Sequence, residues 1–244
     1  MLGLVSARPV STRVLLQDAP RSLAELSREH RDGWGVARWT GSWHVEKSTQ
    51  CAAMCQRYAQ VVDHAPANLL IAHVRQKTVG ETSLANTHPF RRHVAGCELV
   101  FAHNGTLRDV GVVMKAVSTE RAAEIAGDTD SERLFAYIAT AIDEAGNVDK
   151  GIRNAVVRLH TLHRENSIGA INFLLSCGAR LYAHRLGRSL HVLKRGGDQD
   201  AQRAAAVVFA SERLTDEAWQ EIAEGALLKV ERGSNAEPVI TQLI

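Results

Sequence analysis

Two long helices stand out in the pattern of apolar and polar positions along the chain. In the first, apolar side chains recur at the spacing of one helix face: Leu134, Phe135, Ile138, Ala141 and Ile142. Just before them, Thr129 and Glu132 stand three residues apart, which is the signature of a capping box. The pattern predicts a helix that begins at Thr129 and ends near Gly146. A second amphipathic helix is predicted from Val148 to Leu162.

Short runs of strand-forming residues lie on both sides of these helices. The predicted strands are the opening run 1–7, a hairpin of 34–39 and 43–45, and runs 68–74, 99–103, 169–176, 180–184, 190–193, 205–210 and 227–230. A short helix near Leu23 and a helix over 52–63 are also predicted. Strands, then helices, then strands indicate an α+β fold, and runs that are apolar on both faces indicate stacked sheets covered by helices. Without a repeat or a low-complexity linker, we expect one domain over residues 1–244.

Composition narrows the classes of function. The chain is 45% hydrophobic and 23% charged, as is typical of soluble globular proteins, and its net charge of +2 is too small to indicate a nucleic-acid partner. We expect no membrane span, because no apolar run approaches about 18 residues. The four cysteines form no Cys-x-x-Cys pair and the 11 histidines no metal-binding repeat. We therefore expect no metal, no cofactor and a cytoplasmic location.

Two charged residues could hold the two ends of an amino acid. Arg75 ends an apolar strand, where its guanidinium could bind a carboxylate through two parallel hydrogen bonds. Asp130 stands in the first turn of the predicted helix, where its carboxylate could receive an ammonium group. Each residue also has a plainer interpretation. Arg75 could be a solvated charge at a strand end, and Asp130 could serve only to complement the helix dipole.

Four further residues are candidates on weaker local grounds. Asn104 and Gly105 could point an amide and a backbone N–H at one spot and form an oxyanion hole, although Asn-Gly is also a common turn dipeptide. His88 precedes Pro89, which favours extended backbone suited to a loop beside a cleft, or it could be an ordinary loop histidine. Trp34, between two glycines, is either a binding residue or a core tryptophan.

Five motifs together resemble a known family. They are, in order, Asp-Gly-Trp-Gly at 32–35, Ala-His-Val-Arg at 72–75, Asn-Thr-His-Pro-Phe at 86–90, His-Asn-Gly at 103–105 and Gly-Asp-Thr-Asp-Ser-Glu at 127–132. This order is similar to class II glutamine amidotransferases, which are N-terminal nucleophile hydrolases, and most similar to their small stand-alone, YafJ-like subgroup. The resemblance spans nearly the whole chain. It implies a four-layer αββα sandwich of two antiparallel sheets.

The resemblance also implies a mechanism and roles for residues. In the family, the thiolate of an N-terminal cysteine attacks the glutamine amide, its own α-amino group (pKa about 7.7–8) acts as base, and a γ-glutamyl thioester is hydrolysed. By motif, Arg75 would bind the α-carboxylate and Asp130 the α-ammonium. Asn104 and Gly105 would form the oxyanion hole, while Thr78 and His88 would line the pocket. Val79 departs from the pattern, because many members have histidine there.

The start of the chain departs further from the family. Members of the subgroup commonly begin Met-Cys-Arg, and Met1-Leu2-Gly3 would match the three residues after that opening. A start assigned three residues late is the interpretation we prefer, and a genuine loss of the nucleophile is the alternative. As written, the chain is predicted not to hydrolyse glutamine.

Two functions are compatible with the sequence. The first is a glutaminase or amidotransferase, a hydrolase or transferase acting on glutamine or a γ-glutamyl amide, with an ammonia-accepting partner and a homo-oligomeric state as further options. The second is a non-catalytic pseudoenzyme that binds glutamine or a partner protein. Chance occurrence of five ordered motifs in an unrelated α+β domain is the weakest reading.

Overall fold

Two antiparallel sheets form the centre of the structure, a computed structural model that describes residues 1–63, 66–197, 204–231 and 237–244. The first sheet has seven strands in the order β11-β9-β10-β1-β4-β2-β3, and the second has six in the order β13-β12-β8-β7-β6-β5. The strands of the first sheet are β1 (Leu2–Val10), β2 (Trp34–Trp39), β3 (Trp43–Ser48), β4 (Ala67–Val74), β9 (His191–Arg195), β10 (Ala206–Ala210) and β11 (Gln220–Glu221). Those of the second are β5 (Phe90–Val94), β6 (Cys97–Leu107), β7 (Gly169–Ser176), β8 (Arg180–His184), β12 (Leu227–Glu231) and β13 (Val239–Gln242).

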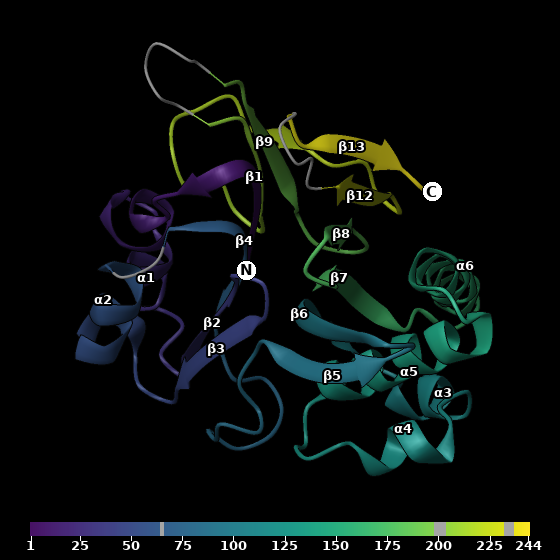
Figure 1. The fold of residues 1–244 in the computed structure, drawn as a ribbon. Coiled ribbons are helices and arrows are strands. Elements are labelled where there is room, and N and C mark those ends of the chain that lie inside the picture. Colours follow the sequence, from purple (N-terminus) through teal and green to yellow (C-terminus); the bar gives the residue numbers. More distant parts are fainter. Residues whose placement is uncertain (64–65, 198–203, 232–236) are drawn as a thin grey trace.

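Helices cover the outer face of each sheet (Figure 1). A helical turn at Val14–Asp18, α1 (Leu23–Leu26), a turn at Ala52–Met54 and α2 (Gln56–Asp63) pack on the seven-stranded sheet, through residues such as Leu16 and Tyr58. The six-stranded sheet carries α3 (Val110–Met114), α4 (Thr119–Ala123), α5 (Asp130–Ala145) and α6 (Val148–Asn166). The result is the α+β sandwich that the sequence and the resemblance predicted.

The alternation of side chains along a strand separates three apolar layers. In β1, Leu2 and Leu4 point to the helices, whereas Met1 and Val5 belong to a cluster between the sheets. That middle cluster also contains Val100 and Ala102 of β6. Residues at the ends of β1 and β6 on this inner face are therefore directed toward the space between the sheets.

The structure confirms most predicted elements and corrects two. Helix α5 begins after Thr129, whose hydroxyl accepts the Glu132 N–H, and ends at Gly146. The predicted helix over 52–63 is instead a short turn followed by α2, because Cys55 takes extended backbone angles between them. The strand predicted to end at residue 103 continues to Leu107, because β6 pairs with β7 through Asn104 and Gly105. The Asn-Gly dipeptide is therefore part of a strand, and the turn alternative is wrong.

Candidate functional site

One cavity of about 520 Å³ opens at the end of the sandwich and collects six of the seven residues singled out from the sequence. These six are Arg75, Thr78, His88, Asn104, Gly105 and Asp130. They come from strand β6, helix α5 and the loop between β4 and β5. Trp34 does not line the cavity.

Arg75 directly follows β4 and is only 3% exposed, so it is not a solvated strand-end charge. Its backbone N–H donates to the Gly33 carbonyl at 2.8 Å, and its carbonyl accepts the Asp32 N–H at 3.0 Å. Its Nη2 donates to the Val79 carbonyl at 3.1 Å, while the buried Nη1 has no hydrogen-bond partner among the described residues. Burial lowers the pKa of the guanidinium. A buried cation with an unused donor is suited to an anionic ligand.

Asp130 begins α5 and is 6% exposed. One carboxylate oxygen accepts the Leu107 N–H at 2.6 Å and the other accepts the Ser131 N–H at 2.9 Å. The positive end of the helix stabilises this charge. A carboxylate has about four lone-pair sites, so Asp130 keeps acceptor capacity for an ammonium group.

Asn104 and Gly105 lie near the end of β6, in the six-stranded sheet. Arg75 follows β4, which belongs to the seven-stranded sheet. A Cβ on Gly105 would stand 2.0 Å from the Ala170 carbonyl oxygen, so glycine is required for the close contact with β7. The Asn104 side chain is on the same face of β6 as Val100 and Ala102, toward the space between the sheets. Among the described residues it makes no hydrogen bond, which leaves its amide available to a ligand.

Three buried histidines stand around the same space. His88, 5% exposed, has no partner for either ring nitrogen among the described residues, and its ring centroid lies 4.4 Å from that of His73. His103 bridges Ser131 Oγ at 2.9 Å and the Ala170 carbonyl at 3.1 Å, so its network assigns the proton to Nε2. Burial lowers the pKa of all three imidazoles, which are therefore neutral at pH 7. His73 and His103 were not among the residues predicted from the sequence to form the site, although both lie within the motifs at 72–75 and 103–105.

Trp34 is fully buried and packs edge-on against Tyr58, with ring centroids 5.0 Å apart. This placement matches the core-tryptophan interpretation rather than a ligand contact. The next residue, Gly35, allows the close contact with the His88 loop, because a Cβ at this position would stand 2.1 Å from the His88 carbonyl oxygen. The Asp-Gly-Trp-Gly segment therefore lets the His88 loop approach β2 closely.

The rim of the cavity, formed by residues from the chain start and from the segments after β8 and β10, was not predicted from the sequence. Arg188, Ser189, Ser211 and Glu212 line the cavity, as does Met1. The Met1 α-amine donates to Ser211 Oγ at 3.1 Å, and burial lowers its pKa to about 6. None of the four cysteines, all of them described, lines the cavity.

Residues 1–199 match the family described as glutamine amidotransferases, class II. The chain belongs to this family. It is 29% identical to the putative glutamine amidotransferase YafJ of Escherichia coli, over 80% of this chain and 83% of that protein. It is also 31% identical to a putative glutamine amidotransferase of Haemophilus influenzae, over 72% of this chain but only 58% of that protein.

Solved structures show the same fold at lower identity. A Pseudomonas aeruginosa structure, described as a predicted glutamine amidotransferase, matches with a TM-score of 0.67 and 23% identity, over 100% of this chain and 98% of that one. The allosteric regulatory enzyme of purine biosynthesis matches with a TM-score of 0.71 and 18% identity, over 99% of this chain but 48% of that one. Within the described residues of this class II domain, no helix has both the length and the apolar character to span a bilayer.

Proposed function

We propose that this class II domain binds glutamine, or a related γ-glutamyl amide, and that a chain carrying the family's N-terminal cysteine hydrolyses the side-chain amide. One observation carries the proposal: Arg75 and Asp130 line one cavity together with Asn104 and Gly105. The cavity thus offers a cation, an anion and an amide donor, which are the groups that a zwitterion with a reactive amide requires.

Each role follows from the local chemistry. The free donor of Arg75 would bind the α-carboxylate, and Asp130 would bind the α-ammonium. Asn104 Nδ2 and the Gly105 N–H would stabilise the tetrahedral oxyanion, at roughly 2.7–4 kcal/mol of barrier per donor. Thr78 and His88 would complete the wall. These assignments combine the motif resemblance with the shared cavity.

The nucleophile in this proposal is the cysteine of a Met-Cys-Arg segment before Met1. Once the methionine is removed, the α-amino group of the cysteine would take the proton of its thiol, and the thiolate would attack the amide carbon. The resulting α-ammonium of the cysteine would give that proton to the leaving ammonia, and water would then cleave the thioester to give glutamate. The register of β1 supports the placement, because Leu2 lies opposite Ala72 in β4. Continued backward in the same register, the second residue before Met1 would lie opposite Arg75 and share the inner face with Met1.

A non-catalytic binding module is the second candidate, and it is favoured by the absence of any cysteine of this chain from the cavity lining. The three codons before Met1, read in frame, test the first proposal at once, because they should encode Met-Cys-Arg.

The decisive experiment compares three proteins: the chain as given, the chain extended by Met-Cys-Arg, and the same extension with alanine replacing the cysteine. Only the cysteine form should release ammonia and glutamate in equal amounts from glutamine, or release the amine from a γ-glutamyl anilide. If all three bind glutamine without turnover, the domain is a binding module. If none binds glutamine or a γ-glutamyl amide, the proposed ligand is wrong.

A further inference from the structure

Glu132 makes a set of contacts that the capping-box pattern does not predict. Its carboxylate does not return to Thr129. Instead it accepts the backbone N–H of Ala126 at 3.0 Å and of Gly127 at 2.7 Å, and it pairs with Arg92 Nη2 at 3.0 Å. Glu132 is 5% exposed and lies outside the lining of the candidate site. A buried side chain therefore holds the turn that leads into Asp130.

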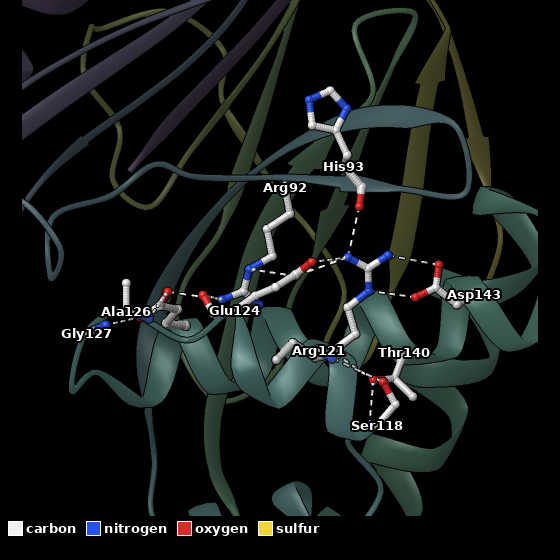
Figure 2. Close-up of polar contacts among 11 residues, drawn as sticks. Arg92, His93, Ser118, Arg121, Glu124, Ala126, Gly127, Thr140 and Asp143 are labelled. Carbon is white, nitrogen blue, oxygen red and sulfur yellow. Dashed lines mark hydrogen bonds and ion pairs between the residues drawn. The ribbon is translucent and has the colours of Figure 1, made fainter.

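Arg92 of β5 makes this arrangement an ion pair with little access to water. The Arg92 residue is 7% exposed, its guanidinium lies 5.2 Å from the Phe135 ring centroid, and Nη2 also donates to the Glu124 carbonyl at 3.1 Å (Figure 2). A buried guanidinium requires an opposite charge, and removing one partner of such a pair is strongly destabilising locally. Glu132 thus has a fixed position against the second sheet.

Asn86 holds the same turn from the other side. Its Oδ1 accepts the Asp128 N–H at 2.8 Å, and its Nδ2 donates to the Glu81 carbonyl at 3.0 Å. Three consecutive backbone N–H groups, from Ala126 to Asp128, are therefore bound by side chains. The backbone entering Asp130 is set by these contacts before any ligand binds.

We propose that Glu132, held in place by Arg92, is a positioning residue that fixes Asp130 for the substrate's α-ammonium. The inference rests on the proposed function, because it assigns the α-ammonium to Asp130. Glu132 touches no substrate in this arrangement. It acts by fixing the turn at 126–129, so that the Asp130 carboxylate is already oriented. Binding of the ligand then costs no conformational entropy for ordering that side chain.

The Glu132→Gln variant tests this with almost no change in volume. An amide has one acceptor oxygen, so its NH₂ group would oppose either a backbone N–H or Arg92. The binding of glutamine and of glutaramic acid, which lacks only the α-amino group, would be measured by calorimetry. The parent should prefer glutamine. In Glu132→Gln, glutamine should bind about tenfold more weakly, as expected for the loss of one charge-assisted contact, while glutaramic acid should be unaffected.

Asp143→Asn supplies the matched control. Asp143 accepts two bonds from Arg121, at 2.6 and 3.0 Å, in the last turn of the same helix and makes no contact with the turn at 126–129 (Figure 2). This variant should keep the parent's preference for glutamine. Arg92→Lys, which retains a cation beside Glu132, is the milder second variant and should reduce the preference by a smaller factor than Glu132→Gln.

The ratio of the two affinities decides the outcome, provided that circular dichroism shows folded protein. If Glu132→Gln and Arg92→Lys weaken both ligands by the same factor, or leave the preference intact, the positioning role is wrong while the proposed function stands. If the parent binds glutamine no better than glutaramic acid, the role of Asp130 itself is overturned. If the parent binds neither, the proposed function has failed.

Discussion

The guanidinium of Arg75 and the carboxylate of Asp130 line the same cavity, although one follows a strand of the seven-stranded sheet and the other begins the helix that covers the six-stranded sheet. Each is held by backbone contacts: Arg75 to Gly33 and Val79, and Asp130 to Leu107. The two sheets therefore keep an opposite pair of charges apart across a hollow. Two such charges, each with unused hydrogen-bonding capacity, suit a small zwitterion better than they suit each other.

Replacing either charge should strongly weaken glutamine binding. Arg75→Ala and Asp130→Ala each remove a contact between charged groups, which should weaken binding about 10- to 100-fold. Isothermal calorimetry on the chain as given measures this. Arg75→Lys serves as control and should retain part of the affinity, because it keeps the charge but loses the two-pronged geometry. Affinity equal to the parent's in either alanine variant would refute the roles assigned here.

Gly105→Ala should destabilise the fold by about 2 kcal/mol or more, because the new methyl group would overlap the Ala170 carbonyl and force β6 and β7 apart. Gly111→Ala is the matched control: its Cβ would find its nearest neighbour, Asp109 Oδ1, at an ordinary 3.5 Å within helix α3. That variant should be neutral, or more stable by about 0.4–1 kcal/mol. The urea unfolding midpoint of Gly105→Ala should fall, whereas that of Gly111→Ala should stay or rise, and equal shifts would contradict the prediction.

Phe135→Ala should cost about 3–5 kcal/mol of unfolding free energy. Phe135 of α5 is fully buried and stacks on Phe101 of β6 with ring centroids 4.9 Å apart, so its loss opens a cavity between helix and sheet. Val157→Ala on the exposed side of α6 is the comparison, and it should stay within about 0.5 kcal/mol of the parent. A small effect of Phe135→Ala in chemical denaturation would mean that α5 is not packed as described.

Acid should destabilise the protein through its buried histidines. Burial lowers the pKa of His184 to about 3, and it also lowers the pKa of His73, His88 and His103. Below the unfolded value of about 6.5, the unfolded chain binds more protons than the folded one, so stability is full above that pH and is lost as pH falls toward the folded pKa.

Urea midpoints at about pH 7.5 and about pH 5.5 test this, and the lower pH should give the lower midpoint. His184→Phe removes one buried imidazole beside Phe173 and should reduce the difference between the two midpoints. A midpoint that rises on acidification would show that other groups dominate.

The sequence predicted the elements whose signals are local. Thr129 and Gly146 mark the ends of α5 as expected, because a hydroxyl cap and a C-terminal glycine act within one turn of backbone. Five of the six cavity residues lie in motifs whose order resembles a family, and Thr78 was named from the resemblance alone. The seventh, Trp34, is in the core, where its ring packs against Tyr58. A tryptophan between glycines carries no local signal that distinguishes a core residue from a binding residue.

What the sequence could not predict depends on partners far along the chain. The extent of β6 is set by pairing with β7, and the carboxylate of Glu132 in α5 is directed by Arg92, which is on strand β5. The rim residues Ser211 and Glu212 reach the cavity only because β10 pairs with β1. Contacts of this kind do not change the pattern of apolar and polar residues in either segment, so neither segment alone predicts them.

The cavity has one wall of regular strand and one wall of loop. The strand wall belongs to β6, which pairs continuously with β7 from Val100 to Leu107. Asn104 pairs with Asn172 in that ladder, so its backbone amide proton should exchange with solvent only when the sheet itself opens. The facing wall, residues 75–89, contains neither helix nor strand. Insertions or substitutions in that loop can therefore change the shape of the cavity during evolution. Changes in the opposite wall would disrupt the pairing of β6 with β7 and so destabilise the fold.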